Sequence, residues 1–453
     1  MLNKLTSLDV IGIWGTGKVG RSAAHFLNTY YKNIKIIFFD EKKVKSCDLE
    51  FELLKFELLK FELIEELENI ELFFSKINYL IPSPGIPKYK YISRNIKIIS
   101  ELDIFSDFYK NNSIAITGTV GKTTTVLLLD HCLKLANINS IALGNIGEPL
   151  LLWKPEKDSL PILELSSFQL ENSNYYAPQI SVIINLYNNH LDHHLDFNNY
   201  KKAKLNVLKN QKDGLIITHN SLVQEIRAIN KKIPVIYTDF VPDLYPNESY
   251  ILQESNQDLV LINLNGKHKI GNYQEFNNLQ QRLAKDTVLI VLAIFNFLKI
   301  KFDYKYLTSF VLPSHRAETI AIKNNVEYID DSKSTIIEAT LHALKMQNKP
   351  TILLLGGVSK GVDRQNIFKE LVFLNQLKFI IFFGKEAEML SEQAFSYFKN
   401  IASCKNLEEA VILAKKIALS GEVVLFSPSG ASFDLFNNYQ ERGQRFKELV
   451  NLW

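Results

Sequence analysis

The stretch ITGTVGKTTT at residues 116–125 contains the residue types that bind the phosphates of a nucleotide. Gly118 and Gly121 let backbone N–H groups turn toward a ligand, Lys122 supplies a positive charge, and the hydroxyl of Thr123 can ligate Mg²⁺. The loop is shorter than the common phosphate loop, because two residues instead of four separate its glycines. An apolar strand precedes it and a helical segment follows it. We therefore predict an ATP or GTP site rather than a glycine-rich turn with an incidental lysine.

The turn GTGKVG, from Gly15 to Gly20, has glycines at the first, third and sixth places of the dinucleotide-binding pattern, and Asp40 follows about 20 residues later. A nicotinamide dinucleotide is one ligand of such a turn. The diphosphate of any nucleotide-linked substrate is another, and the second nucleotide site downstream favours this interpretation.

Ionisable side chains follow the strands in the middle of the chain. Glu164 ends the apolar strand in LELSSFQLE, where a carboxylate can reach a metal on the triphosphate, although such a residue is more often a solvated rim residue. In NLYNNHLDHH, His190 lies nearest the preceding strand. Zinc is not favoured there, because no cysteine or distant histidine pair completes a tetrahedral set. The lysines of the segment 198–210 have the pattern of a solvated helix face.

Cationic and polar residues also occur at predicted strand ends in the last third of the chain. They are His315 and Arg316 in LPSHRAE, Asp331, Lys333 and Thr335 in IDDSKST, Lys360 in LGGVSKGVD, and Ser432 and Phe433 in SPSGASFDLF. Open α/β sheets bind ligands at the carboxyl ends of their strands, so we expect these residues to contribute to a site.

Apolar strands that alternate with helical segments must position these side chains. Strands are predicted in DVIGIWG, IKIIFFD, SIAIT, PILELSS, ISVIINL, GLIIT, PVIYT, PTILLLGG, KFIIFFG and GEVVLFSPSG, and a hairpin in TIAIKNNVEYIDD that turns at Asn324 and Asn325. This alternation predicts three tandem α/β domains with largely parallel sheets, at 1–105, 106–311 and 312–453. The pentad repeat at 51–67 predicts a surface helix, and TVLIVLAIFNFLKI at 287–300 predicts a buried one.

Composition describes an ordinary globular protein, with 46% hydrophobic and 22% charged residues. A net charge of +3 is too small to argue for nucleic acid or membrane surfaces. The N-terminus has no signal-peptide pattern, and no apolar stretch reaches the length of a membrane span. Three scattered cysteines suit a reducing compartment. We expect a cytoplasmic protein without nucleic-acid or membrane partners.

These motifs, in this order, resemble the Mur ligase family over nearly the whole chain. GTVGKTT is similar to the shortened phosphate loop of the family, and LELSSFQLE, DSKST and SPSGASFDLFNNYQERGQRF resemble its D-glutamate-adding branch. The resemblance implies an ATP-dependent ligase that adds D-glutamate to UDP-N-acetylmuramoyl-L-alanine through an acyl phosphate, in peptidoglycan precursor synthesis. It implies a Rossmann-like N-terminal domain for the UDP-linked substrate, a central P-loop ATPase-type domain, and a Rossmann-like C-terminal domain for the amino acid. We expect a monomer with a hinged third domain.

The resemblance also implies roles for individual residues. ATP would contact Gly118, Thr119, Val120, Gly121, Lys122, Thr123, Thr124, Arg316 and Asp331. The UDP-linked substrate would contact Gly15, Thr16, Gly17, Lys18, Val19, Gly20, Asp40, Asn145 and Ser166, and D-glutamate would contact Lys333, Thr335, Lys360, Ser432 and Phe433. Two Mg²⁺ sites would use Thr123, Glu164, His190 and Lys204, and the catalytic set would be Lys122, Glu164, His190 and Lys204. Lys204 matches the lysine that CO₂ carbamylates in the family, which turns an amine into a carboxylate-like ligand.

The sequence departs from the family in two places. Val120 stands where the family usually has Asn, and a His-Asn pair with a later Asn has no counterpart in NLQQRLAKDTVLIVLAIF. A catalytically impaired, nucleotide-binding member of the family is therefore the alternative. A folylpolyglutamate synthase is disfavoured because its substrate carries no UDP, so it would not need the nucleotide-binding turn from Gly15 to Gly20. A nicotinamide oxidoreductase leaves the phosphate loop unexplained.

Overall fold

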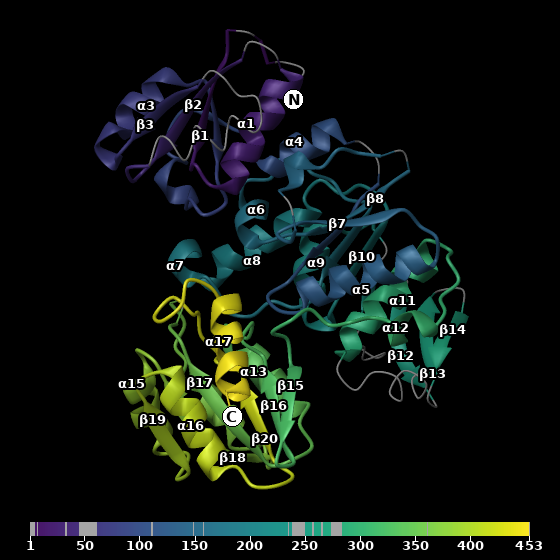
Figure 1. The fold of residues 1–453 in the computed structure, drawn as a ribbon. Coiled ribbons are helices and arrows are strands. Elements are labelled where there is room, and N and C mark those ends of the chain that lie inside the picture. The colour runs from purple at the N-terminus through teal and green to yellow at the C-terminus, as the bar shows by residue number, and fades with distance from the viewer. Residues whose placement is uncertain are drawn as a thin grey trace. The chain divides into compact units, whose positions relative to one another are not determined.

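The computed structural model describes residues 5–6, 8–31, 34–44, 61–109, 112–147, 149–156, 158–233, 235–237, 250–255, 258–263, 266–272, 283–359 and 361–452. The chain divides into two compact units. The first unit contains Met1–Leu186, Asn198–Leu279 and Ala284–Thr308, and the second contains Tyr187–Phe197, Gln280–Leu283 and Ser309–Trp453. The described residues form three sheets, two in the first unit and one in the second (Figure 1). The predicted α/β class is confirmed.

The first sheet has five parallel strands in the order β3-β2-β1-β4-β5. Its elements are β1 (Val10–Trp14), α1 (Lys18–Tyr30), β2 (Lys35–Asp40), β3 (Glu62–Glu65), η2 (Leu67–Asn69), α3 (Ile70–Lys76), β4 (Tyr79–Pro82), η3 (Lys88–Lys90) and β5 (Lys97–Ile98), where η denotes a 3₁₀ segment. Ile13 joins a buried cluster with Leu27 of α1, whereas its neighbour Trp14 joins another with Phe73 of α3. Successive strand residues face opposite sides, so both faces of the sheet are covered.

The pentad repeat does not form the predicted surface helix where the structure describes it. Residues 51–60 lie outside the described residues, and the end of the repeat forms strand β3 and η2 instead. Ile64 pairs with Phe39 of β2 and is buried. Helical spacing of apolar residues is a weak signal, and here the backbone pairing with β2 and the burial of Ile64 override it.

The second sheet has nine strands in the order β14-β13-β12-β11-β10-β9-β6-β8-β7. Its strands are β6 (Ile114–Thr117), β7 (Ser140–Gly144), β8 (Leu160–Glu164), β9 (Ile180–Ile183), β10 (Leu215–Thr218), β11 (Val235–Tyr237), β12 (Tyr250–Ser255), β13 (Asp258–Asn263) and β14 (Gly266–Asn272). The predicted strands β6, β8, β9, β10 and β11 are confirmed, whereas the antiparallel pairs β12–β13 and β13–β14 were not predicted. Strand β6, which leads into the phosphate loop, has β8 and β9 as parallel neighbours.

Helices accompany this second sheet in the first unit. They are α4 (Glu101–Phe108), α5 (Lys122–Leu135), η4 (Leu150–Leu152), α6 (Ser167–Glu171), α8 (Phe197–Leu205, whose first residue belongs to the second unit), η5 (Asn206–Leu208), η6 (Asn220–Leu222), α9 (Val223–Ile229), α11 (Lys285–Phe297) and α12 (Lys305–Thr308). Helix α11 is buried from Thr287 to Phe295, which confirms the predicted buried helix.

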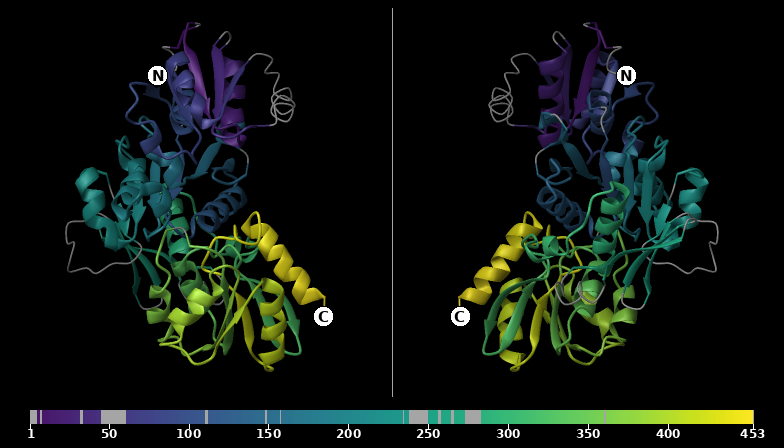
Figure 2. Two further views of the ribbon diagram at one scale, coloured as in Figure 1. Left: turned by 90° about the vertical axis from the view of Figure 1, so that its left-hand side faces the viewer. Right: turned by 90° about the vertical axis from the view of Figure 1, so that its right-hand side faces the viewer.

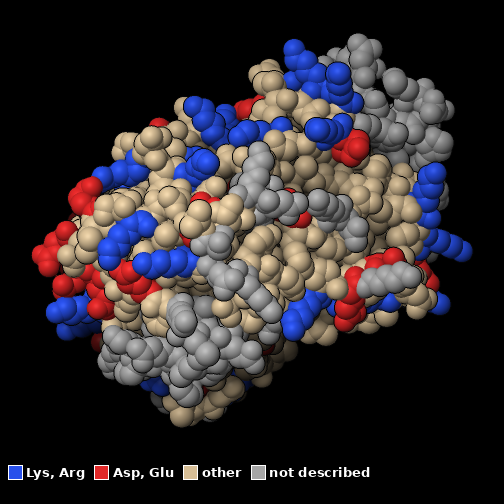
Figure 3. Space-filling view, turned by 90° about the horizontal axis from the view of Figure 1, so that it is seen from above, with Lys and Arg blue, Asp and Glu red and all other residues tan. Residues whose placement is uncertain are grey.

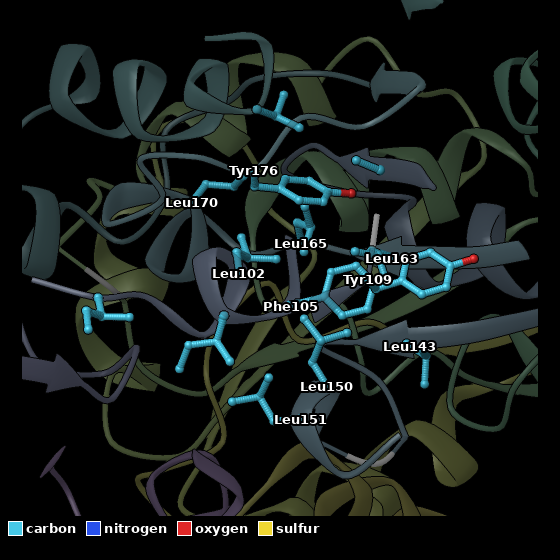
Figure 4. Close-up of a cluster of buried hydrophobic side chains, with 14 of the residues drawn as sticks. Leu102, Phe105, Tyr109, Leu143, Leu150, Leu151, Leu163, Leu165, Leu170 and Tyr176 are labelled. Carbon is cyan, nitrogen blue, oxygen red and sulfur yellow. The ribbon is translucent and has the colours of Figure 1, made fainter. Parts of the chain in front are cut away.

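An apolar cluster fixes α4 to the second sheet. Leu102 and Phe105 of α4 lie with Leu150 of η4, Leu165 after β8 and Leu170 of α6 (Figure 4). Each of these side chains is at most 4% exposed. Burial of a large apolar side chain contributes roughly 1.5–3 kcal/mol, so the start of α4 is held firmly against the elements that carry Glu164 and Ser166.

The third sheet belongs to the second unit and has six strands in the order β15-β16-β20-β17-β18-β19. Its elements are β15 (Glu318–Lys323), β16 (Val326–Asp330), α13 (Ile337–Lys345), β17 (Thr351–Gly356), α14 (Asn366–Leu371), β18 (Leu377–Phe383), α15 (Ala387–Ala394), β19 (Ile401–Cys404), α16 (Leu407–Ile417), β20 (Val423–Phe426) and α17 (Tyr439–Asn451). Leu354 of β17 packs with α16 and α17, and Leu353 packs with α13, α14 and α15. Helices lie on both faces of the sheet, as Figure 2 shows.

The predicted hairpin is confirmed as β15 and β16, which pair antiparallel with a turn at Asn324 and Asn325. Both turn residues have positive φ, 50° and 60°, as the tight hairpin turn with the favoured twist requires.

Basic and acidic side chains are both scattered over the face shown in Figure 3. Among the described residues, no helix combines the length and apolar character that crossing a membrane requires. Cys132 and Cys404 are buried free thiols, and Cys47 lies outside the described residues.

Candidate active site

The predicted phosphate loop connects β6 to α5. Gly118 has a φ of 149° and Gly121 one of 88°, values that residues with a side chain rarely adopt. Thr123 and Thr124 are half-buried in the first turn of α5. The N–H groups of a first helical turn lack intrahelical partners, so this loop presents donors and a positive helix end to an anion.

Asn185, which follows β9, holds the loop in place. Its side-chain Oδ1 accepts from the N–H groups of Thr119 at 3.1 Å and Val120 at 3.0 Å. Its Nδ2 donates to the carbonyl of Val120 at 3.3 Å, and its own carbonyl accepts from Thr119 N–H at 3.0 Å. The apolar side chain of Val120 makes no polar contact, so the polar support at this point comes from the neighbouring strand.

Lys122 turns back over the loop. Its Nζ donates to the carbonyls of Gly118 at 2.8 Å and Thr119 at 3.0 Å. The ammonium group therefore lies among the loop atoms that surround a phosphate in the predicted site.

Glu164 ends β8 directly beside β6 and is 2% exposed. One carboxylate oxygen, Oε1, accepts from Asn145 Nδ2 at 3.0 Å. The other, Oε2, is buried and has no hydrogen-bond partner within the described part of the chain. A buried carboxylate oxygen without a donor is costly unless it is neutralised, and it is a ligand that Mg²⁺ prefers. The residues present therefore fit a magnesium ion.

Lys204 is buried on α8, with 2% of its surface exposed, so it does not belong to a solvated helix face. Its Nζ donates to Thr117 Oγ1 at 3.2 Å and lies 5.4 Å from the ring centroid of Tyr200. Burial lowers the pKa of Lys204 well below its usual value, the charge of Lys122 lowers it further, and the carboxylate of Glu164 opposes both. The site thus favours a neutral amine at Lys204.

The glycine-rich turn of the first sheet connects β1 to α1, as predicted. Asp40 at the end of β2 accepts from Thr16 N–H at 3.1 Å and Thr16 Oγ1 at 2.8 Å. A Cβ added to Gly20 would lie 2.1 Å from the carbonyl oxygen of Gly15, so the close approach of helix and turn requires glycine there. The Asp40 carboxylate therefore holds Thr16 of the turn in place through these two hydrogen bonds.

A pocket of about 320 Å³ lies beside this turn within the first unit. Its walls are Gly17, Lys18, Val19, Ser83, Pro84, Gly85, Glu101, Gly144, Asn145, Pro149, Ser166, Phe168 and Gln169. Five of the predicted substrate contacts, Gly17, Lys18, Val19, Asn145 and Ser166, therefore line one cavity.

Ser166 caps α6 in a reciprocal arrangement with Gln169. Ser166 Oγ accepts from Gln169 N–H at 3.2 Å, and Gln169 Oε1 accepts from Ser166 N–H at 3.1 Å and from Ser166 Oγ at 3.0 Å. This capping box fixes the hydroxyl of Ser166 at the pocket wall.

His190 precedes the short helix α7 (Leu191–His194) with left-handed backbone at φ 55°. Its N–H donates to Asn189 Oδ1 at 3.0 Å. His190 belongs to the second unit, whereas Glu164 and Lys204 belong to the first. Its role at a second metal site stays a prediction.

Asp331 lies buried after β16. Its Oδ2 accepts from Ser427 Oγ at 2.7 Å, and its Oδ1 accepts from Ala317 N–H at 3.1 Å. Burial raises the pKa of Asp331 to about 7, and the hydrogen bond from Ser427 opposes this rise. Arg316 is half-buried and next to Ala317 in the chain, so both predicted nucleotide contacts of the second unit lie at one end of its sheet.

The described residues among those predicted for D-glutamate lie in loops of the second unit. Lys333 Nζ lies 3.8 Å from the ring centroid of Tyr439, Thr335 is half-buried, and Ser432 is buried. Phe433 is 72% exposed. Lys360 lies outside the described residues.

Arg442 of α17 joins two of these loops. It is fully buried, and its guanidinium donates to Ser332 Oγ at 3.1 Å, to the Ser332 carbonyl at 2.7 Å and to the Gly430 carbonyl at 2.9 Å. Ser332 precedes Lys333, and Gly430 lies two residues before Ser432. One side chain therefore fixes two of the loops that carry the predicted amino-acid pocket.

Sequence reasoning missed Asn185, Gln169, Glu101 and Arg442. A polar residue after an apolar strand and an S-x-x-Q capping pattern were available signals for Asn185 and Gln169. No sequence pattern indicates that Glu101 and Arg442 are buried, because acidic first-turn residues and helix arginines are usually exposed.

Residues 116–273 match the family model described as the Mur ligase middle domain. A UDP-N-acetylmuramoylalanine--D-glutamate ligase from Francisella tularensis subsp. tularensis is 32% identical over 459 residues, which cover 99% of this chain and 96% of that protein. Another from Caldicellulosiruptor bescii is 30% identical over 468 residues, with 96% of each chain covered.

Solved structures with the same fold include the MurF ligase of Thermotoga maritima in complex with ADP, with a TM-score of 0.57, 16% identity, and coverage of 92% of this chain and 95% of that one. E. coli FolC in complex with DHPP and ADP has a TM-score of 0.55 and 12% identity, and the match covers 82% of this chain and 99% of that one.

Proposed function

This chain belongs to the Mur ligase family, and we propose that it joins D-glutamate to UDP-N-acetylmuramoyl-L-alanine, converting ATP to ADP and phosphate, in peptidoglycan precursor synthesis. The observation that carries the proposal is the similarity to D-glutamate ligases over nearly the whole chain, together with a phosphate loop flanked by the buried pair Glu164 and Lys204.

ATP is bound through the phosphate loop. The first-turn N–H groups of α5 and the ammonium of Lys122 stabilise the negative charge of the β- and γ-phosphates. Lys122 can exchange its loop carbonyls for phosphate oxygens with a small movement, because those carbonyls line the same loop. Its charge offsets the charge that develops during phosphoryl transfer.

Magnesium, when bound, neutralises the phosphate oxygens and orients the γ-phosphate for attack. Thr123 and the unpartnered Oε2 of Glu164 would hold one ion, and His190 and Lys204 would contribute to a second. Carbamylation of Lys204 needs an unprotonated amine. The depressed pKa of Lys204 supports that modification.

The UDP-linked substrate would occupy the pocket beside the glycine-rich turn. The N-terminal end of α1 would face the diphosphate, and Asn145 and Ser166, which line the same pocket, would face the muramoyl part. The alanyl carboxylate would then attack the γ-phosphate of ATP, the bond from the γ-phosphorus to the oxygen bridging it to the β-phosphate would break, and an acyl phosphate would form as ADP leaves. The amine of D-glutamate then attacks the acyl carbon, and phosphate leaves.

The loops of the second unit that carry Lys333, Thr335, Ser432 and Phe433 would bind D-glutamate, the amino acid that accepts the acyl group. Lys333 offers a positive charge to a carboxylate of D-glutamate, and the hydroxyls of Thr335 and Ser432 offer hydrogen bonds. The exposed ring of Phe433 would cover the side-chain methylenes.

Phosphate release measured across amino acids tests the function. Release is expected when ATP, UDP-N-acetylmuramoyl-L-alanine and D-glutamate are all present, and omission of any one should reduce it to background. Equal release with L-glutamate or a diamino acid would contradict the D-glutamate assignment, and no release with any amino acid would favour an impaired nucleotide-binding protein.

Lys122→Ala sharpens this test, because loss of the phosphate-loop charge should lower kcat at least about 100-fold. Lys134→Ala is the matched control, since Lys134 lies on the same helix and pairs with Asp130 at 2.7 Å. The control should keep its turnover.

A further inference from the structure

Glu101 is a carboxylic acid buried in the wall of the substrate pocket. It begins α4, where acidic side chains usually face solvent, yet it is only 6% exposed. Its Oε2 accepts from Gln169 Nε2 at 3.4 Å, and its Oε1 is buried without a hydrogen bond of ordinary geometry among the described residues. The apolar cluster around Leu102 and Phe105 prevents α4 from moving this group into water.

The contacts with Glu101 and Ser166 together determine which way the Gln169 amide faces. With Nε2 directed at the carboxyl group, Oε1 is directed at Ser166, where it accepts both the backbone N–H and the hydroxyl. A reversed amide would place a donor against the N–H of Ser166 and an oxygen against an acidic oxygen. The three residues therefore form one chain of hydrogen bonds with a single favourable orientation.

All three residues of this chain line the pocket of about 320 Å³. Ser166 caps α6 and Gln169 lies on it, whereas Glu101 comes from α4, so the carboxyl group supports their orientation from a second helix. We propose, on the basis of the proposed function, that Glu101 is a positioning residue that fixes Gln169 and Ser166 for the UDP-linked substrate.

The charge state of Glu101 matters because the substrate is anionic. Burial raises the pKa of Glu101 to about 7, and the donors Gln169 Nε2 and Leu150 N–H oppose the rise only partly. Below this pH the group is neutral. Above it, a buried negative charge would face a ligand that carries a diphosphate and a carboxylate, and the low polarity of the wall strengthens their repulsion.

The described elements packed against Glu101 carry both neutral and charged groups, among them Glu171 of α6. Gln169 on α6 and the Leu150 region of η4 contribute neutral groups, Lys18 of α1 lines the same pocket, and Asp103 on α4 accepts from the N–H groups of Asn174 and Tyr175. Glu164 lies behind Asn145. We therefore expect binding of the UDP-linked substrate to weaken as the pH rises through about 7.

Calorimetric titration of the full chain with UDP-N-acetylmuramoyl-L-alanine, without ATP, tests this role at about pH 6 and about pH 8.5, on either side of the Glu101 transition. Wild-type protein is expected to bind about fivefold more weakly at the higher pH. Glu101→Gln keeps a neutral acceptor for Gln169 Nε2, so its affinity should match the wild type at about pH 6 and should lose most of the pH dependence.

Glu101→Ala removes the acceptor and should weaken binding about tenfold at both pH values. Glu68→Gln, an exposed acidic residue of η2, is the matched control and should behave as wild type. Thermal melting and binding of ADP verify folding of each variant. Unchanged affinity in Glu101→Ala, or an unaltered pH dependence in Glu101→Gln, would overturn the proposal. Failure of the wild type to bind the UDP-linked compound would instead reject the proposed function.

Discussion

Val120 and Asn185 are hydrogen-bonded in both directions. The Val120 N–H donates to Asn185 Oδ1 at 3.0 Å, and Asn185 Nδ2 donates to the Val120 carbonyl at 3.3 Å. The phosphate loop is thus tied to the end of β9 at the position where its own side chain is apolar. An amide side chain from the neighbouring strand supplies the polar support that the loop residue lacks.

Asn185→Ala should raise the KM for ATP about tenfold with a smaller effect on kcat. The Val120 N–H loses its acceptor, the Thr119 N–H keeps only the main-chain carbonyl of residue 185, and the loop is held less firmly, at a cost of about 1–3 kcal/mol. Phosphate-release kinetics and the thermal shift produced by ADP measure the effect. Asn210→Ala is the control, because Asn210 Nδ2 donates to the carbonyl of Asn174 at 2.7 Å, away from the loop. An unchanged KM in Asn185→Ala would show that the loop keeps its shape unaided.

Lys204 should carry a carbamate when CO₂ is available. Its amine is buried and favours the neutral form, which is the form that reacts with CO₂. After equilibration with ¹³C-bicarbonate, wild-type protein should show a carbamate signal by ¹³C NMR. Lys204→Arg should lose both the signal and turnover, whereas Lys202→Arg, at an exposed position of α8, should keep both. A signal that persists in Lys204→Arg would assign the carbamate elsewhere.

Asp331 should make stability decrease as the pH rises. Its folded-state pKa of about 7 exceeds the ordinary value of 3.8, so the folded protein holds this proton more tightly than the unfolded chain. The free energy of unfolding should therefore decline between about pH 4 and about pH 7, by up to about 4 kcal/mol from this group, and then level off.

Asp331→Asn removes that titration, and denaturant unfolding across the same pH range should show a smaller slope than the wild type. Asp363→Asn, at an exposed position, serves as control. Parallel stability curves for wild type and Asp331→Asn would mean that Asp331 keeps its charge in the folded protein.

Gly20→Ala should destabilise the protein by about 2–3 kcal/mol, because the added Cβ would lie 2.1 Å from the Gly15 carbonyl oxygen and force the turn and α1 apart. Gly17→Ala offers a close comparison. A Cβ at Gly17 meets no heavy atom within 4 Å, so its effect on unfolding should stay below about 0.5 kcal/mol. Equal unfolding free energies for the two variants would contradict the steric argument.

Phe433→Ala should raise the KM for D-glutamate several-fold and leave the unfolding free energy nearly unchanged. The ring is 72% exposed, so its removal opens no cavity in the core. Steady-state kinetics with each substrate varied in turn would separate the effect on D-glutamate from those on ATP and the UDP-linked substrate. Phe395→Ala, another exposed ring of the second unit, is the control. A loss of stability without a change in KM would place Phe433 in the fold rather than at the acceptor.

Parts of the fold that rest on local patterns could be predicted from the sequence. Runs such as IAIT and VVLF form buried strands, Asn324 and Asn325 form the hairpin turn, and Gly15, Gly118 and Gly121 have the positive φ that glycine permits. Ile64 shows the limit of this approach. Its spacing fits a helix, but pairing with Phe39 of β2 makes it a strand residue. A pattern within a short stretch of sequence contains no information on which distant strand will pair with it.

Some residues of the candidate site could likewise be predicted from the sequence, and others could not. Lys122 and Glu164 follow from motif and strand-end position, and burial of Lys204 agrees with the role implied by family resemblance. Asn185 and Glu101 could not be assigned, because their importance depends on which atoms of distant segments face them. Hydrogen-bond partners far apart in the chain are a property of the folded structure.

Arg442 has a consequence for the order in which the protein is made. Its donors reach the carbonyls of Ser332 and Gly430, so both loops are fixed by a residue that follows them in the chain. The N-terminal part of a chain emerges from the ribosome first, and domains generally fold as they emerge. Both glycine-rich loops will thus have emerged well before residue 442 can tie the amino-acid loops together. During synthesis, the chain should therefore become able to bind nucleotide before it can bind D-glutamate.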